Sequence, residues 1–233
     1  MSAGGPVKLL LFDIDGTLVA TNESGLLGFT RAMREAFGAD DDLSRIDFAG
    51  ATDGDIIRQL FLLHGIPFEP ENVERFRAAY FPALADLLPQ RQGHVLPGIV
   101  PLLDALAKRD DVQLGLLTGN FAESARLKLT HYGLWDYFPF GAFADDAMER
   151  NELGPFALQR ARDFRAGVEF EPSRDAWIIG DTPKDIACAR AFGARVLAVA
   201  TGRHRMEQLA PHAPDFVVPD LAQTQRTLEL LLG

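Results

Sequence analysis

The chain has 233 residues, with 33 Asp and Glu against 23 Lys and Arg and a formal net charge of −10. Its hydrophobic fraction of 47% and charged fraction of 24% are those of an ordinary globular protein, which excludes wholesale disorder. The acidic balance argues against nucleic-acid binding, which needs Lys and Arg to displace counterions. No stretch approaches the roughly 20 apolar residues that span a bilayer. No secretory signal is visible, and the single cysteine, Cys188, fits a reducing compartment. We therefore expect a cytoplasmic protein with no membrane partner.

Short apolar runs that alternate with helical patterns predict an α/β fold. The first run, KLLLFD at 8–13, is typical of a buried parallel strand. Further strands are expected at 113–118, 176–181, 194–200 and 215–218, with a weaker one at 140–144. Helical patterns fall between them at 99–108, 122–131, 156–165 and 184–192. This order predicts a Rossmann-like core built on a parallel sheet.

The interval after the first strand breaks that alternation. It carries helical patterns at 24–37, 53–64 and 71–87 and no convincing strand. An unstructured loop of this length is improbable in a compact domain. We therefore expect an inserted, all-helical cap at 20–93 on a core made of 1–19 and 94–233.

Three polar motifs come directly after predicted strands. They are DIDGT at 13–17, TGN at 118–120 and GDTPKD at 180–185. Ligands of open parallel sheets bind outside the carboxyl ends of the strands. Parallel pairing would therefore bring the three motifs together, although the outer two lie far apart in the sequence.

The chemistry of these motifs points to phosphoryl transfer. Their carboxylates would repel one another without a cation, and Mg²⁺ suits such oxygen ligands. The motifs also supply neutral groups that bind phosphate oxygens, namely Gly16, Thr17, Thr118, Gly119 and Asn120. Of Asp13 and Asp15, one could act as nucleophile and the other as acid/base, so that displacement would pass through an acyl phosphate. Each motif alone is also explained by a turn or a helix cap, and only their convergence favours a site.

The segments LLFDIDGTLV, LLTGN and IIGDTPKDIACARAFGA resemble the motifs of the haloacid dehalogenase superfamily of aspartate-nucleophile phosphatases. The resemblance implies that Asp13 is the nucleophile and a metal ligand. It implies that Asp15 is the acid/base and binds Mg²⁺ through its backbone carbonyl, with Asp181 as a third metal ligand. Thr118 would bind the transferring phosphoryl group, and Asp185 would orient the basic residue or a metal-bound water. The helical insert resembles the C1 cap of the superfamily.

The third motif departs from the family pattern. The superfamily places a Lys or Arg there, whereas the equivalent stretch here, DDAMERNELGPFALQRA at 145–161, contains no Lys. Arg150 is the preferred candidate because it precedes a predicted helix, and Lys184 is a rival from the fourth motif. Arg160 and Arg162 fall within the helix and are expected to face solvent.

The segment GATDGDIIRQL at 50–60 resembles the cap loop that sets specificity in phosphoglycolate phosphatase-like and phosphoglucomutase-like members. On this reading Gly50, Thr52, Asp53 and Arg58 could face the substrate, and Thr52 and Arg58 are the candidates for contact with it. The alternative is that Thr52 or Asp53 caps the following helix while Arg58 is solvated. Capping and substrate contact are compatible.

These observations together predict a Mg²⁺-dependent phosphatase that hydrolyses a small phosphate monoester, such as phosphoglycolate or a sugar phosphate, through an aspartyl phosphate. Asp15 favours phosphoryl chemistry over carbon–halogen cleavage, because the dehalogenase branch lacks the second aspartate. A phosphomutase with the same nucleophile and a non-catalytic binding or regulatory member remain as alternatives. The expected partner is a small phosphorylated molecule, and no oligomeric state is predicted.

Overall fold

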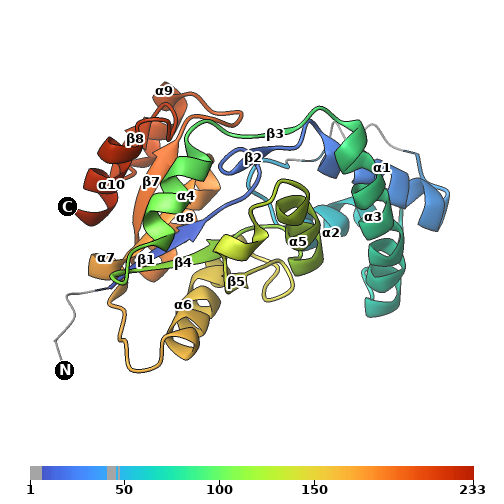
Figure 1. The fold of residues 1–233 in the computed structure, drawn as a ribbon. Helices are drawn as coiled ribbons and strands as arrows, with labels where there is room; N and C mark the ends of the chain where they lie inside the picture. The colour runs from blue at the N-terminus through green and yellow to red at the C-terminus, as the bar shows by residue number, and fades with distance from the viewer. Residues whose placement is uncertain (1–6, 41–45, 47) are drawn as a thin grey trace.

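The computed structural model describes residues 7–40, 46 and 48–233. Their centre is a six-stranded parallel sheet of order β5-β4-β1-β6-β7-β8, with β1 well inside it (Figure 1). The strands are β1 (Lys8–Phe12), β4 (Val112–Leu117), β5 (Gly141–Ala142), β6 (Ala176–Gly180), β7 (Arg195–Val199) and β8 (Phe216–Val218). The expected strands and the α/β class are therefore confirmed. The acidic run Asp40–Asp42 predicts a solvated loop between helices of the insert, and of these residues Asp41 and Asp42 lie outside the described part of the chain.

Helices cover both faces of the sheet, because β1 is apolar on each side. Leu10 and Phe12 pack into one hydrophobic cluster and Leu9 and Leu11 into another. The first cluster includes residues of α4 (Ile99–Ala107), α5 (Ala122–His131) and α10 (Thr224–Leu232). The second includes residues of α6 (Leu153–Phe164), α8 (Pro183–Phe192) and α9 (Met206–Leu209). This alternation explains why the central strand is an almost unbroken apolar run.

The helical interval after β1 forms a third hydrophobic cluster of its own. Its helices are α1 (Ser24–Phe37), α2 (Asp53–Leu63) and α3 (Pro70–Gln90), and Figure 1 shows them beside the sheet rather than on its faces. The chain leaves the sheet region through β2 (Val19–Ala20) and returns through β3 (His94–Val95), which pair with each other antiparallel. The proposed cap boundaries at 20 and 93 remain a prediction.

The element bounds differ from the predicted ones in places. The helix expected at 71–87 extends over Pro70–Gln90 with Pro82 inside it, and α6 begins at Leu153 instead of 156. The pair β2 and β3 was not expected, since two-residue strands carry no detectable period. Helices α9 and α10 and the short α7 (Pro172–Asp175) were also missed.

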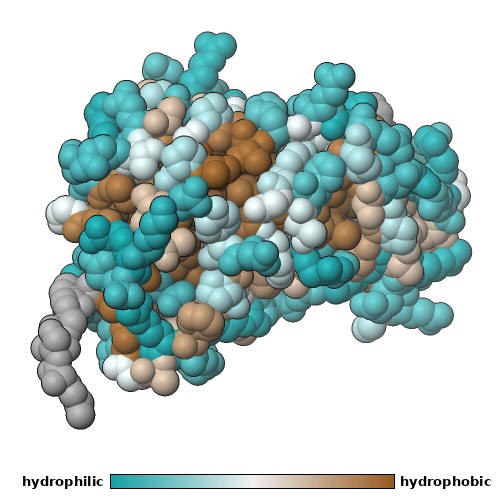
Figure 2. Space-filling model, in the orientation of Figure 1, coloured by the Kyte–Doolittle hydropathy of each residue, from teal (hydrophilic) through white to brown (hydrophobic). Residues whose placement is uncertain are grey.

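On the face drawn in Figure 2, hydrophilic residues cover most of the surface and hydrophobic residues gather in patches between them. Among the described residues no helix combines the length and the apolar composition that crossing a bilayer requires. Even α3, which has 21 residues, alternates charged and apolar side chains. Cys188 is fully buried in α8, as expected.

Candidate active site

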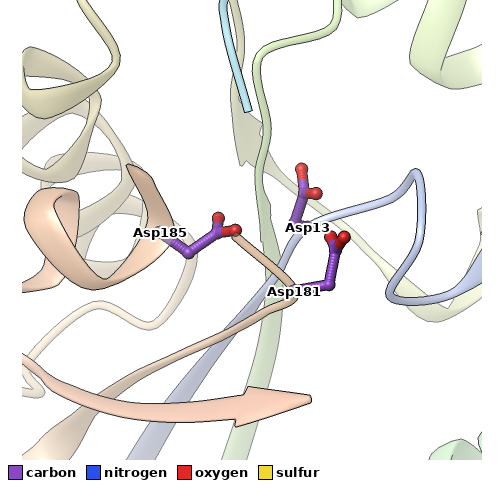
Figure 3. A group of neighbouring side chains, drawn as sticks. All are labelled: Asp13, Asp181 and Asp185. Atoms are coloured by element: carbon purple, nitrogen blue, oxygen red, sulfur yellow. The ribbon is translucent and has the colours of Figure 1, made fainter. Parts of the chain in front are cut away.

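The three sequence motifs meet at the carboxyl edge of the sheet. β1 pairs with β4 on one side and with β6 on the other, so the residues that follow these strands become neighbours. The Asp13 amide donates to the Ile179 carbonyl over 2.9 Å. One carboxylate oxygen from each of Asp13, Asp181 and Asp185 lies within 4.8 Å of the others. Figure 3 shows the first two side by side, with Asp185 directed toward them from the start of α8.

The turn after Asp15 depends on glycine. Gly16 has a φ of +81°, and a Cβ there would stand 2.5 Å from Oδ2 of Asp181. Both the backbone conformation and the space therefore require glycine. The next residue, Thr17, is buried and donates from Oγ1 to Oδ1 of Asp181 over 3.3 Å. The DIDGT motif thus positions the carboxylate of Asp181 as well as its own.

Arg150 is the basic residue that the structure places against Asp13. It begins the short 3-10 helix η2 (Arg150–Glu152) and is 6% exposed. Its Nη2 lies 3.0 Å from Oδ1 of Asp13 and 2.5 Å from Oδ1 of Asp185. The side chains of Arg160 and Arg162 are 40% and 37% exposed and pair elsewhere, with Asp146 and Glu169.

Asp185 holds this guanidinium from inside the protein. Its side chain is fully buried, and its Oδ2 accepts hydrogen bonds from the amide and the hydroxyl of Thr182 over 2.9 and 2.7 Å. These contacts form a capping box at the start of α8. Both carboxylate oxygens of Asp185 are thereby engaged, one by Arg150 and one by Thr182. The geometry suits a residue that orients Arg150 better than one that binds a metal.

The two remaining carboxylates of the cluster form a site for a cation. Burial is the main cause that raises the pKa of Asp13 to about 6, and the nearby Asp185 and Asp15 add to it while Arg150 opposes it. Burial, followed by Asp185 and Asp13, also raises the pKa of Asp181 well above its ordinary value. Such oxygen donors are those that hard divalent cations select. The carboxylates of Asp13 and Asp181 therefore fit a site for such a cation.

Asp15 has a different partner, which the sequence analysis missed. Nζ of Lys128 lies 2.6 Å from Oδ2 of Asp15 and also donates to Oδ1 of Asn120 over 2.6 Å. Asn120 Nδ2 donates to the same Asp15 oxygen over 2.9 Å, and Thr21 donates to the other over 3.3 Å. Burial acts to raise the pKa of Asp15, but the charge and hydrogen bond of Lys128 outweigh it and the pKa is lowered. The acid/base candidate is thus held ionised.

A signal for Lys128 was present in the helix that carries it. On α5 the buried residues are Ser124, Ala125, Lys128 and Leu129, which share one face at helical spacing. Lys128 lies on this face and is only 4% exposed. A lysine in the buried stripe of a helix needs a partner, and the carboxyl end of the sheet offers one.

The TGN motif after β4 organises this network. Thr118 is fully buried, and its Oγ1 accepts from Asn120 Nδ2 over 2.8 Å. The Gly119 carbonyl accepts from the Asp53 amide over 2.6 Å. A Cβ at Gly119 would stand 2.1 Å from the Ala51 carbonyl oxygen. This glycine therefore lets the loop before α2 approach the sheet, a role the sequence did not indicate.

Of the loop residues expected to face substrate, Gly50 and Asp53 line the cavity described next, whereas Thr52 and Arg58 do not. Thr52 is 1% exposed, caps α2 by accepting from the Asp55 amide over 3.1 Å, and donates to the Met148 carbonyl over 2.6 Å. The Arg58 side chain is 54% exposed and pairs with Asp55. The structure thus shows the capping alternative for Thr52 and a solvated Arg58. The carboxylate of this loop that faces the site is that of Asp53, whose Oδ2 accepts from the Phe121 amide and the Ser124 hydroxyl.

A cavity of about 450 Å³ lies between these groups and helices α1, α2 and α3. On the sheet side it is lined by predicted site residues, namely Asp13, Asp15, Gly16, Gly119, Asn120, Arg150 and Asp181. Lys128 lines it as well, whereas Lys184 does not. Thr17, Thr118 and Asp185 support the wall from behind.

Comparison with known proteins agrees with this geometry. Residues 10–199 match the model of the family described as haloacid dehalogenase-like hydrolase. The chain is 31% identical to a phosphoglycolate phosphatase of Rhodospirillum rubrum over 85% of this chain and 81% of that protein. It is 29% identical to the probable phosphatase IndB of Dickeya dadantii over 96% and 94% of the two chains. A crystal structure of a hydrolase from Pseudomonas syringae superposes with a TM-score of 0.74, at 21% identity over 97% of this chain and all of the other. The chain therefore belongs to the haloacid dehalogenase-like hydrolases, and its phosphatase relatives agree with the predicted class of phosphoric monoester hydrolase.

Proposed function

We propose that this protein is a Mg²⁺-dependent phosphatase that hydrolyses small phosphate monoesters through an aspartyl phosphate on Asp13. The observation that carries the proposal is the placement of two buried carboxylates, Asp13 and Asp181, with a buried arginine paired to Asp13, beside a cavity of about 450 Å³. The phosphatase relatives support the same reaction. Mg²⁺ held by Asp13, Asp181 and the Asp15 carbonyl would offset the negative charge of the phosphate and of the carboxylates.

The first step is attack by the Asp13 carboxylate on phosphorus. Arg150 holds Oδ1 of Asp13, which fixes the rotamer and leaves Oδ2 as the attacking oxygen. The bond from phosphorus to the ester oxygen breaks, and Asp15 gives that oxygen its proton. Lys128 keeps Asp15 ionised in the free protein, but an arriving phosphate dianion raises the pKa of a neighbouring carboxyl. Substrate binding therefore favours uptake of the proton that Asp15 then transfers.

The second step releases the phosphate. Asp15, now ionised, takes a proton from a water molecule as it attacks the phosphorus of the acyl phosphate. The bond between phosphorus and the Asp13 oxygen breaks, which restores the carboxylate. Arg150 stabilises the negative charge that returns to Asp13.

The helical insert has a defined part in this proposal. Residues 20–93 would form a cap that covers the phosphate and keeps bulk water from the acyl phosphate. The contacts between Thr52 and Met148 and between Asp53 and α5 suit such a closed arrangement. Nucleic acid and membranes have no part in it.

The test is phosphate release from a panel of phosphate monoesters, with and without Mg²⁺, by the wild-type protein and Asp13→Asn. We expect Mg²⁺-dependent turnover in the wild type and its loss in the variant. Equal release by both proteins would show that Asp13 is not the nucleophile. A wild type that forms a long-lived aspartyl phosphate without releasing phosphate would favour a phosphomutase instead.

A further inference from the structure

The cavity beside Asp13 extends well beyond the space that a phosphate group needs. Its volume of about 450 Å³ lies within the usual range for sites that hold a whole small molecule. The wall opposite the aspartates comes from the helical insert. It includes the polar residues Thr21, Asn22, Glu23 and Asp53. Its apolar part consists mainly of Leu26 and Phe29 from α1, Phe48 from the loop before α2, Ile56 from α2 and the ring of Tyr80 from α3.

The aromatic residues of this wall pack on one another. The ring centroid of Phe29 lies 4.5 Å from that of Tyr80 and 6.2 Å from that of Phe48. Phe29 is 2% exposed and Tyr80 is fully buried, so this part of the wall is held in place by packing. Apolar groups of a ligand bind favourably against such a rigid hydrocarbon surface, because they are removed from water there. A charged group gains little from the same contact.

The charged groups around the cavity also disfavour a second anionic group on the substrate. Among the described residues that line it, the two buried cations are already paired, Lys128 with Asp15 and Arg150 with Asp13. The insert itself contributes carboxylates, Glu23 and Asp53. A phosphate would therefore meet both cations, whereas a second anionic group would lie against carboxylates and aromatic rings, where like charge is unfavourable. The remaining lining cation, Arg203, is exposed and follows β7 on the sheet side.

We propose that the preferred substrate is a phosphate monoester of an uncharged alcohol that carries an aromatic or other bulky apolar group. Esters with a second anion, such as 2-phosphoglycolate, are predicted to be poor substrates, although several relatives act on phosphoglycolate by name. This inference rests on the proposed phosphatase function and specifies its substrate class.

The first experiment compares kcat/KM of the wild-type protein for benzyl phosphate, ethyl phosphate and 2-phosphoglycolate. All three esters release an alkoxide, so their intrinsic reactivities are close. We expect benzyl phosphate to exceed ethyl phosphate at least about tenfold and 2-phosphoglycolate to be no better than ethyl phosphate. A preference for 2-phosphoglycolate would overturn the substrate class alone. Absence of release from all three and from p-nitrophenyl phosphate would refute the phosphatase function, and the substrate class with it.

The second experiment removes part of the apolar wall. Leu26 is half-buried and lines the cavity, whereas Leu62 of α2 is 81% exposed and does not. Leu26→Ala is expected to lower kcat/KM for benzyl phosphate about tenfold and to leave ethyl phosphate nearly unchanged, while Leu62→Ala changes neither. Leu26→Lys is expected to raise the ratio of 2-phosphoglycolate to benzyl phosphate. An equal loss for benzyl and ethyl phosphate in Leu26→Ala would mean a structural role and would overturn the proposal.

Discussion

Replacing Arg150 with methionine tests the electrostatic balance of the site. The change keeps a long apolar side chain but leaves the buried carboxylates of Asp13 and Asp185 without the cation that lies 3.0 and 2.5 Å from them. At an effective dielectric constant of 20, two unit charges about 4 Å apart attract by about 4 kcal/mol, and closer ones by more, before desolvation is counted. Breaking one partner out of a buried pair costs about 3–5 kcal/mol. We therefore expect Arg150→Met to lower the free energy of unfolding by about 3 kcal/mol at pH 7.5.

The assay is urea unfolding of metal-free protein followed by circular dichroism. The matched control is Arg160→Met, since the Arg160 side chain is 40% exposed and its pair with Asp146 should contribute less than about 1 kcal/mol. At low pH, Arg150→Met should lower the free energy of unfolding by less, because protonated carboxyls carry no charge for a cation to balance. If Arg150→Met and Arg160→Met were equally stable at pH 7.5, our reasoning about the buried ion pairs would be refuted.

The other predictions concern Lys128, which no motif singled out, and Asp53 of the loop before α2. Lys128→Met should lower kcat/KM for phosphate release at least about tenfold, less than the roughly 10²–10⁴-fold that a general acid or base itself contributes, because Asp15 loses the ammonium 2.6 Å away. Lys128→Arg should recover part of the rate, and the exposed Lys108→Met should leave it unchanged; wild-type kinetics in Lys128→Met would contradict the assignment. Burial raises the pKa of Asp53 to about 6, so its folded form holds the proton more tightly than its unfolded form. The stability it contributes is present below about pH 4 and is lost as pH rises through 6. Urea unfolding should therefore show the wild type losing about 2 kcal/mol relative to Asp53→Asn between about pH 4 and pH 6, and a constant difference would rule this out.

The sequence predicted the part of the site that follows the strands. Asp13 and Asp181 come directly after apolar runs, and parallel pairing alone brings such residues together. Arg150 was chosen because the third motif of the superfamily carries a basic residue and because it precedes a predicted helix, and the structure puts it against Asp13. The two aspartates were predicted more directly, because strand ends are visible in a sequence.

The rest of the site depends on how helices pack, which a linear pattern does not specify. Lys128 reaches Asp15 from the second turn of α5, and only the position of that helix against the sheet decides whether the lysine is solvated. Thr52 and Arg58 are residues that the sequence assigned to the site and that the structure places outside the cavity. Their loop was expected to contact substrate, yet Thr52 bonds to the Met148 carbonyl and Arg58 faces solvent. The apolar wall of the cavity likewise comes from helix packing rather than from a motif.

The antiparallel pairing of β2 with β3 has a topological consequence. The chain enters the helical insert at Ala20 and returns at His94, and these two residues pair directly. The two ends of the insert are therefore adjacent in space, as the termini of exchangeable units commonly are. The strand order of the parallel sheet does not depend on which helices lie between the two ends of the insert. Evolution can thus lengthen, shorten or replace the helices at this junction, while the aspartates at the carboxyl ends of the strands stay where the sheet puts them.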